Sequence, residues 1–317
     1  RQPVDRIPLG FYAVDYDTVE KVLGRPTYVR NKIQTQLAYW DGRRDEVVES
    51  LKKDTVEFYR KIDCADIILP KEAPVVPPRG FRPEPPKKIA DDKWEDKKGR
   101  IFQAVWHANE IGCIHDPTPK QTEFKEEDYQ KPRPVKPPDP SIFEALDHVI
   151  RKLGRDRYVA GVTGGITAMT RLGGTETGLV LCALQPEVVL AANRQAVAYQ
   201  NACDEHYIRP GVAGVLMEQD MAGTQAPMIS PDMFRELCFP FLKGRIAHVK
   251  RFSPQLTLHN CGNNIPLMDM FIEAGVDCYQ SLQTTAGMEI GKLRDLYGKR
   301  LCFWGGVALE TLIMGSP

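Results

Sequence analysis

Residues 255–262 read Gln-Leu-Thr-Leu-His-Asn-Cys-Gly. An apolar segment leads into His259 and Cys261, and Gly262 interrupts the extended pattern where a turn is needed. Side chains two residues apart on a strand lie on the same face, so we expect the imidazole and the thiol to point the same way. A nitrogen and a sulfur donor at this spacing form half of a zinc site. The alternative is a buried histidine and cysteine that only pack.

Short apolar segments of this kind recur along the chain and alternate with helical patterns. Strands are predicted near residues 9, 67, 160, 215, 257, 279 and 302. Helices are predicted at 15–23, 29–39, 45–62, 141–153, 166–184, 186–206, 231–252, 265–274 and 289–296. Such alternation forms βαβ units and a parallel sheet.

These units predict an α/β fold, a (β/α)8 TIM barrel. An open Rossmann-like sheet is the alternative, but no Gly-x-Gly-x-x-Gly follows the first strand. The chain stops at Pro317, about where a further helix and an eighth strand would follow. We therefore expect the last unit of the barrel to be missing from this sequence.

Residues 71–140 do not follow this rhythm. Their first part is rich in proline, which excludes a helix or a central strand. Strand-like stretches at 100–106 and 111–114 predict an antiparallel hairpin, and a second proline-rich stretch returns the chain to the barrel. We expect a single barrel domain, 1–317, with an inserted hairpin subdomain at 71–140. The insertion either covers part of the site or is a solvated decoration.

The composition is that of an ordinary globular protein. Of 317 residues, 42% are hydrophobic, and 42 Lys and Arg balance 42 Asp and Glu. Zero net charge without a basic stripe argues against a nucleic-acid or membrane-surface role, and the apolar segments are too short to span a bilayer. The 8 cysteines lie singly, with no Cys-x-x-Cys pair. Reduced thiols of this kind, and the lack of a visible secretory signal, predict a cytoplasmic location.

A barrel would gather its site residues at the carboxyl ends of the strands. Glu218 and Asp220 follow the fourth strand two residues apart, and both are candidate catalytic groups. Glu218 is also a candidate metal ligand, or would orient His259, while helix capping is the alternative. Substrate- or cofactor-facing positions are predicted at further strand ends, namely Tyr12, Gln280, Gln283, Gly305 and Gly306. The glycine pair either admits a ligand close to the backbone or forms a tight turn.

The remaining histidines are weaker candidates. A histidine within a helix or a surface hairpin is usually satisfied or exposed, and this applies to His107, His115, His148, His206 and His248. Gly173-Gly174 before Thr175 would suit a phosphate at a helix start, but a lone glycine pair is not specific.

The part of the chain between residues 217 and 307 contains five motifs. They are Met217-Glu-Gln-Asp-Met-Ala-Gly-Thr-Gln225, Ile229-Ser-Pro-Asp-Met-Phe-Arg-Glu236, Leu258-His-Asn-Cys-Gly262, Phe271-Ile-Glu-Ala-Gly-Val-Asp277 and Phe303-Trp-Gly-Gly-Val307. Together they resemble the uroporphyrinogen decarboxylase superfamily. The resemblance is strong over about 139–317 and loose over 5–69, and it implies a (β/α)8 barrel.

The resemblance favours the cobalamin-dependent methyltransferases of that superfamily over its decarboxylases. Decarboxylases carry an Arg-Gln-Ala-Gly-Arg motif after the first strand, where this chain reads Phe11-Tyr-Ala-Val-Asp15. Thiol-methylating members hold zinc with His-x-Cys and a later Cys. His259 and Cys261 match the first two, and the third would lie beyond Pro317. Some methoxy-compound demethylases use Glu and His ligands, which Glu218 and His259 would match.

The resemblance thus implies a zinc-dependent methyltransferase that moves a methyl group between a small methoxy, methylamine or thiol compound and the cobalt of cobalamin. Because no segment resembles a cobalamin-binding domain, we expect the cobalamin to be carried by a separate corrinoid protein that docks over the barrel mouth. O-demethylation is slightly preferred, since Glu218 is available and the insertion could enclose a substrate. A metal-free decarboxylase and a non-catalytic barrel are the alternatives, and a homodimer is left open.

Overall fold

The computed structural model describes residues 6–166 and 172–315. The chain divides into two compact units, Arg1–Pro119 with Pro138–Ala160, and Lys120–Pro137 with Gly161–Pro317. The predicted insertion, 71–140, is shared between these units, and its status as a separate subdomain stays a prediction. None of the described helices is both long and apolar enough to cross a membrane.

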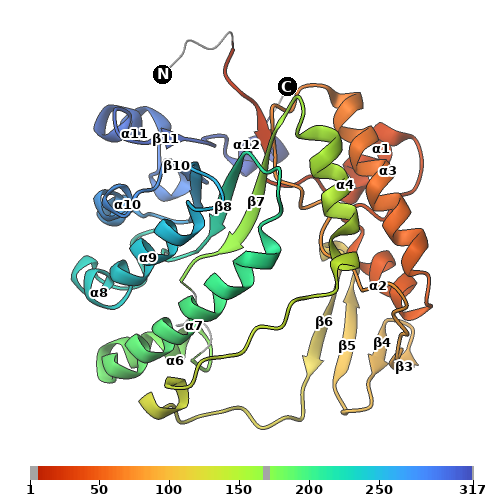
Figure 1. The fold of residues 1–317 in the computed structure, drawn as a ribbon, viewed down its shortest axis with the longest axis horizontal. Helices are drawn as coiled ribbons and strands as arrows, with labels where there is room; N and C mark the ends of the chain where they lie inside the picture. Colours follow the sequence, from red (N-terminus) through yellow and green to blue (C-terminus); the bar gives the residue numbers. More distant parts are fainter. Residues whose placement is uncertain (1–5, 167–171, 316–317) are drawn as a thin grey trace. The chain divides into compact units, whose positions relative to one another are not determined.

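The first unit contains the first parallel strands and their helices. β1 (Gly10–Phe11) pairs with β2 (Ile67–Ile68), and β2 pairs with the start of β7 (Tyr158–Gly164). The helices of this unit are α1 (Tyr16–Leu23), α2 (Lys32–Trp40), α3 (Arg44–Ile62) and α4 (Glu144–Leu153), the last preceded by a 3-10 turn, η3 (Pro140–Phe143) (Figure 1). Each predicted helix of this unit is confirmed to within a few residues at its ends.

An antiparallel sheet of four strands replaces the single predicted hairpin. Its order is β3 (Lys87–Ala90), β4 (Lys93–Glu95), β5 (Ile101–Val105) and β6 (Glu110–His115) (Figure 1). The β5–β6 hairpin is confirmed and turns through η1 (Trp106–Ala108). The prediction missed β3 and β4, because these lysine-rich segments lack an apolar alternation and their strand form depends on pairing with β5.

This antiparallel sheet has a small core of its own. Trp94 and Ala104 are buried against Ile33 of α2, and Leu37 and Trp40 pack around them. The rings of Trp40 and Trp94 lie 5.3 Å apart between centroids. The inserted strands are therefore held to α2 by apolar packing.

The second unit continues the parallel ladder in the order β7-β8-β9-β10-β11. Its strands after β7 are β8 (Gly214–Glu218), β9 (Leu256–His259), β10 (Cys278–Gln280) and β11 (Cys302–Phe303). Its helices are α6 (Thr175–Leu184), α7 (Pro186–Tyr207), α8 (Pro231–Leu237), α9 (Phe239–Val249), α10 (Met268–Ala274), α11 (Ile290–Tyr297) and α12 (Leu309–Met314), with short 3-10 turns η2 (Glu126–Tyr129), η4 (Ile265–Leu267) and η5 (Thr284–Ala286). The seven predicted strands and the TIM-barrel class of fold are confirmed.

Two predicted helices of this unit needed correction. The helix expected at 231–252 is two helices, because Pro240 in the first turn of α9 has no N–H to donate and disfavours helical backbone before it. The start of α8 is as predicted, with the Ser230 side chain accepting a hydrogen bond of 3.2 Å from the N–H of Met233. The helix expected at 166–184 is helical from Thr175, and residues 167–171 lie outside the described residues.

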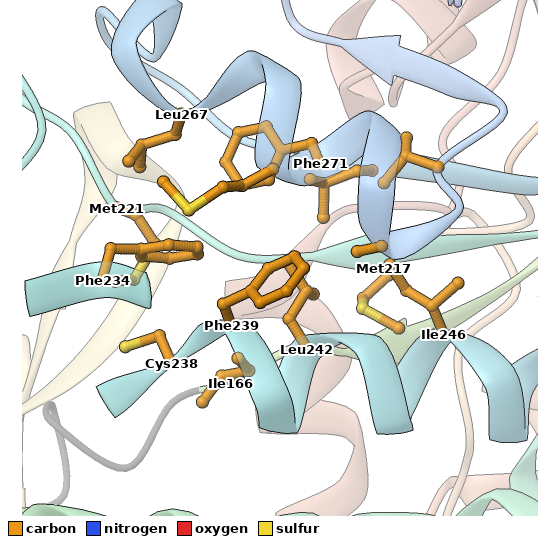
Figure 2. Close-up of a cluster of buried hydrophobic side chains, with 14 of the residues drawn as sticks. Ile166, Met217, Met221, Phe234, Cys238, Phe239, Leu242, Ile246, Leu267 and Phe271 are labelled. Atoms are coloured by element: carbon orange, nitrogen blue, oxygen red, sulfur yellow. The ribbon is translucent and has the colours of Figure 1, made fainter. Parts of the chain in front are cut away.

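The helices of the second unit pack on one face of its strands. Figure 2 shows Met217 of β8, Ile246 of α9 and Phe271 of α10 in the same buried cluster. Leu256 and Leu258 of β9 belong to this cluster as well. Because side chains alternate along a strand, His259 is directed to the opposite face of the sheet. That face is where polar chemistry can be placed without disturbing the core.

A buried ion pair holds the end of β7. Arg245 of α9 is fully buried and donates to Asp204 of α7 at 2.5 Å. The same guanidinium donates to Oγ1 of Thr163 at 3.1 Å and to the carbonyl oxygen of Gly164 at 2.8 Å. The hydroxyl of Thr163 in turn donates to Asp204 at 2.6 Å. One arginine thus connects two helices and the carboxyl end of a strand.

Glu144, the first residue of α4, is surrounded by cations. Its carboxylate accepts a hydrogen bond of 2.8 Å from Arg79, forms an ion pair with Arg44, and lies 3.4 Å from Nζ of Lys52. Burial alone would raise the pKa of Glu144, but the hydrogen bonds from Arg79 and Arg44 and the nearby charges outweigh it and lower the pKa to about 2. The folded state therefore binds fewer protons here than the unfolded chain.

Glu144 should make stability depend on pH in the acid range. A group whose pKa falls on folding stabilises the protein above its ordinary pKa of 4.5, and this stabilisation is lost as the pH falls toward about 2. We expect Glu144→Gln to lower the free energy of unfolding at neutral pH and to flatten its decline over this range, measured by urea unfolding at successive pH values. Glu187→Gln, at an exposed position of α7, is the control, and parallel curves for wild type and Glu144→Gln would contradict the assignment.

Candidate active site

The strand register of the second unit sets three polar side chains side by side. Glu218 of β8 is the register partner of His259 on β9, and His259 is the partner of Gln280 on β10. Partners in a parallel ladder point to the same face, which here is the face away from the helical core. Asp220 and Cys261 lie two residues further along, just beyond the strand ends. The candidate site consists of this row of Glu218, His259 and Gln280 together with Asp220 and Cys261.

Three donor atoms converge beyond these strand ends. The ligand atoms of Asp220, His259 and Cys261 all lie within 4.8 Å of one another. Nε2 of His259 is 3.6 Å from Sγ of Cys261 and 3.7 Å from Oδ1 of Asp220. Tetrahedral zinc, with ligand bonds of about 2.0–2.3 Å, separates its ligand atoms by about 3.3–3.8 Å. The three donors therefore fit a zinc ion, and they are the only such group in residues 6–166 and 172–315.

The loops after β8 and β9 are tied together at this group. The backbone N–H of Cys261 donates to Oδ1 of Asp220 at 2.8 Å. The side chain of Asn260, which is buried, accepts from the N–H of Met221 at 2.9 Å. Both bonds join one loop to the other. The thiol and the carboxylate are thus positioned by backbone contacts that do not depend on a bound metal.

Gly262 allows a third loop to join them. Its φ of +82° lies in the left-handed region, and a Cβ atom there would overlap the carbonyl groups of Ala222 and Gly223. The N–H of Gly262 donates to Oε1 of Gln283 at 3.0 Å. The loop after β10 is therefore fastened to the turn that carries Cys261. Only glycine suits this position, which explains why it follows the cysteine directly.

Gln280 orients the imidazole. Nδ1–H of His259 donates to Oε1 of Gln280, whose side chain is buried. This bond directs Nε2, the other ring nitrogen, to Cys261 and Asp220. Metal-bound histidines in proteins usually have such a partner, which fixes the tautomer and the ring orientation. Gln280 therefore positions His259 in this structure, and its predicted contact with substrate or cofactor stays a prediction.

The electrostatics favour the ligand form of the thiol. The hydrogen bond with His259 lowers the pKa of Cys261, burial opposes it, and Ser281, whose Oγ lies 3.4 Å from the sulfur, lowers the pKa further. Burial lowers the pKa of His259, but hydrogen bonds with Cys261 and Gln280 and the charge of Asp220 outweigh it and raise the pKa above its usual value. The thiolate that a metal requires is thus stabilised, while the imidazole must release a proton to bind one.

The other predicted residues occupy different places. Glu218 stands in the row beside His259 but is not among the three convergent donors, so its roles as ligand and catalytic group stay predictions. Gln283, predicted to face a substrate, has its Oε1 on the N–H of Gly262. Tyr12 lies in the first unit with Nζ of Lys71 3.6 Å from its ring centroid, and its predicted role is untested.

Gly305 and Gly306 follow β11 with φ of +129° and +94°. A Cβ atom on Gly305 would overlap the carbonyl oxygen of Ser281, so a close backbone approach requires glycine there. The backbone that Gly305 contacts belongs to the loop after β10. A ligand contact of this glycine pair remains a prediction, and the five weaker histidine candidates belong to no group of three metal-binding side chains within the described part of the chain.

Two residues of the site were not predicted from the sequence. Ser281 lies beside the sulfur of Cys261, and Asn260 links two loops. Ser281 directly follows Gln280 at a strand end, so the rule that selected Gln280 and Gln283 would have selected it too. The contact of Asn260 could not be predicted in this way, because its side chain accepts from the N–H of Met221, which comes near only when the loops are folded.

We expect Gln280→Leu to weaken metal binding by about 10- to 100-fold, the usual cost of removing a partner that orients a metal-bound histidine. The imidazole would lose the acceptor that fixes its tautomer. Competition with a chromogenic zinc chelator measures the affinity. Gln255→Leu, the same change at an exposed position before β9, is the matched control. Equal competition curves for the two variants would show that Gln280 does not orient the ligand.

Comparison with known proteins agrees with this fold. Residues 110–317, well over half of the chain and all of the candidate site, match the family described as Uroporphyrinogen decarboxylase (URO-D). The structure is similar to that of a methyltransferase from Methanosarcina mazei, with a TM-score of 0.60, 15% sequence identity, and coverage of 96% of this chain and 79% of that chain. At this identity the likeness shows the fold alone. No curated protein sequence matches the chain.

Proposed function

The chain belongs to the uroporphyrinogen decarboxylase family, and from this premise we propose that it is a zinc-dependent methyltransferase. It would move a methyl group between a small methylated compound and the cobalt of a corrinoid carried by a separate protein. The observation that carries the proposal is the convergence of Asp220, His259 and Cys261. Nitrogen, sulfur and carboxylate oxygen are donors that suit zinc, and metal-free decarboxylation does not call for such a set.

Each residue of the group would have a defined part. His259, Cys261 and Asp220 would hold the metal through Nε2, Sγ and a carboxylate oxygen. When bound, zinc supplies a Lewis acid that lowers the pKa of a thiol or polarises an ether oxygen. Gln280 holds the imidazole in the tautomer that leaves Nε2 available, and Ser281 contacts the sulfur.

We propose a methoxy compound as the methyl donor, so that the reaction is an O-demethylation. The support is a second carboxylate, Glu218, which the strand register places beside His259 on the same face. It can serve as a further ligand or, when protonated, donate a proton to the oxygen that leaves. A methylamine or a thiol is the alternative substrate class, because Asp220, His259 and Cys261 would hold zinc for either without Glu218.

The proposal is tested with zinc-loaded protein, reduced cobalamin and separate panels of methoxy, methylamine and thiol compounds. Formation of methylcobalamin, followed by its visible absorbance, is expected with the methoxy panel and only when zinc is bound. Cys113→Ser, at an exposed position of β6, should behave as wild type. Protein that binds no zinc, prepared without chelator and supplied with the ion, would overturn the zinc mechanism and favour a metal-free decarboxylase or a non-catalytic barrel.

A further inference from the structure

Two cysteines that form no disulfide in the structure lie side by side on the strands of the candidate site. Cys278 of β10 and Cys302 of β11 are register partners in the parallel ladder, and Cys278 is likewise the partner of Thr257 on β9. Partners at one level point to the same face. This is the face that carries His259, because Thr257 precedes His259 by two residues on β9. The two thiols thus lie one level below the row of polar side chains.

The register brings the two residues within range of a disulfide. Neighbouring strands lie about 4.7–4.9 Å apart, inside the range of about 4.4–6.8 Å found between the Cα atoms of a disulfide. The interaction with the Cys302 thiol, together with burial, raises the pKa of Cys278, which agrees with the pairing of the two residues in the ladder.

We propose that Cys278 and Cys302 form an oxidisable dithiol, a modification site whose disulfide ties β10 to β11. The Cβ atoms of parallel partners are separated by about the strand spacing, wider than the about 3.5–4.5 Å that an unstrained disulfide prefers. A strained bridge is reduced more easily than a structural one. The bond is therefore of the reversible kind.

The oxidant for this step is a peroxide. The sulfur of Cys302, which is the more exposed, attacks one peroxide oxygen as thiolate, the O–O bond breaks, and a sulfenic acid and hydroxide form. The thiol of Cys278 then attacks that sulfur, the S–O bond breaks, and water leaves. In total the two thiols lose two protons and two electrons, and one hydrogen peroxide becomes two waters. The second step occurs between two residues that the ladder already holds side by side.

The tie would join two strands that support the candidate site. β10 continues into Gln280 and Ser281, which contact His259 and Cys261. β11 continues into Gly305, whose backbone lies against Ser281. Formation of the disulfide does not depend on the proposed methyl transfer. An experiment can therefore contradict either proposal and leave the other unaffected.

The test uses the full chain, loaded with zinc, fully reduced and then treated with a small excess of hydrogen peroxide. Remaining thiols are alkylated, and the peptides are mapped by mass spectrometry without reduction. We expect one linked pair of peptides that contains Cys278 and Cys302 and disappears on treatment with dithiothreitol. Cys302→Ser should abolish the link, and Cys113→Ser, an equally exposed cysteine elsewhere, should retain it.

Two results would overturn the proposal. One is the recovery of both thiols alkylated, or of Cys302 as sulfinic acid beside an unmodified Cys278. The other is a bridge from either residue to Cys261. Cys278→Ala gives an independent check at the less exposed residue of the pair, and circular dichroism shows whether each variant is folded before it is oxidised.

Discussion

Replacing Cys261 by alanine is expected to leave the protein folded and remove its metal. The thiolate is the only sulfur among the three donors, and two ligands from His259 and Asp220 do not hold zinc tightly. Elemental analysis of purified protein should give about one zinc per chain for wild type and close to none for Cys261→Ala. Methyl transfer should fall by more than the about 10- to 100-fold cost of losing an orienting partner. His259→Ala should behave in the same way.

The control and a graded variant separate loss of the metal from loss of the fold. Asp220→Asn keeps an oxygen atom but loses the charge, so we expect a metal affinity between those of wild type and Cys261→Ala. Cys113→Ser removes an exposed thiol of β6 and should keep its zinc. Urea unfolding checks that each variant is folded. A Cys261→Ala protein that retains a full zinc complement would place the metal elsewhere in the chain.

The parallel strands could be predicted from the sequence because each is a local feature. The apolar run before His259 marks β9 without any knowledge of its neighbours, and the other parallel strands carry similar runs. The strands β3 and β4 carry no such signal, since lysine-rich residues become strand only through pairing with β5. The end of α8 before Cys238 could also have been predicted, because Pro240 lies where a continuous helix would need a backbone N–H.

The candidate site was predictable in its location more than in its contacts. Strand alternation and the carboxyl ends of the strands singled out His259 and Cys261. The carboxylate that lies beside these two residues is decided by the loops after β8 and β9. The N–H of Cys261 fixes the carboxylate of Asp220, and a sequence does not show that contact. The amide of Gln280 likewise reaches His259 only because β9 and β10 are paired in this register.

The second large effect is expected on stability, at the buried ion pair of the second unit. Arg245→Met keeps much of the volume of the side chain but leaves Asp204 charged and buried without its cation. Loss of one partner of a buried pair costs about 3–5 kcal/mol in the free energy of unfolding, because the remaining charge is uncompensated. The carbonyl of Gly164 would also lose its donor at the end of β7. Urea unfolding followed by circular dichroism measures the change.

A matched substitution and a double variant make the result specific. Arg235→Met removes an exposed arginine, whose guanidinium lies 3.4 Å from Glu273, and should cost about 0–1 kcal/mol. The double variant Arg245→Met with Asp204→Asn removes both charges and should recover part of the loss, because an amide is cheaper to bury than an unpaired carboxylate. Thr163 still donates to the residue at position 204 in that variant. If the double variant is no more stable than Arg245→Met alone, the cost comes from lost packing and hydrogen bonds of the arginine, and the buried charge of Asp204 is not its cause.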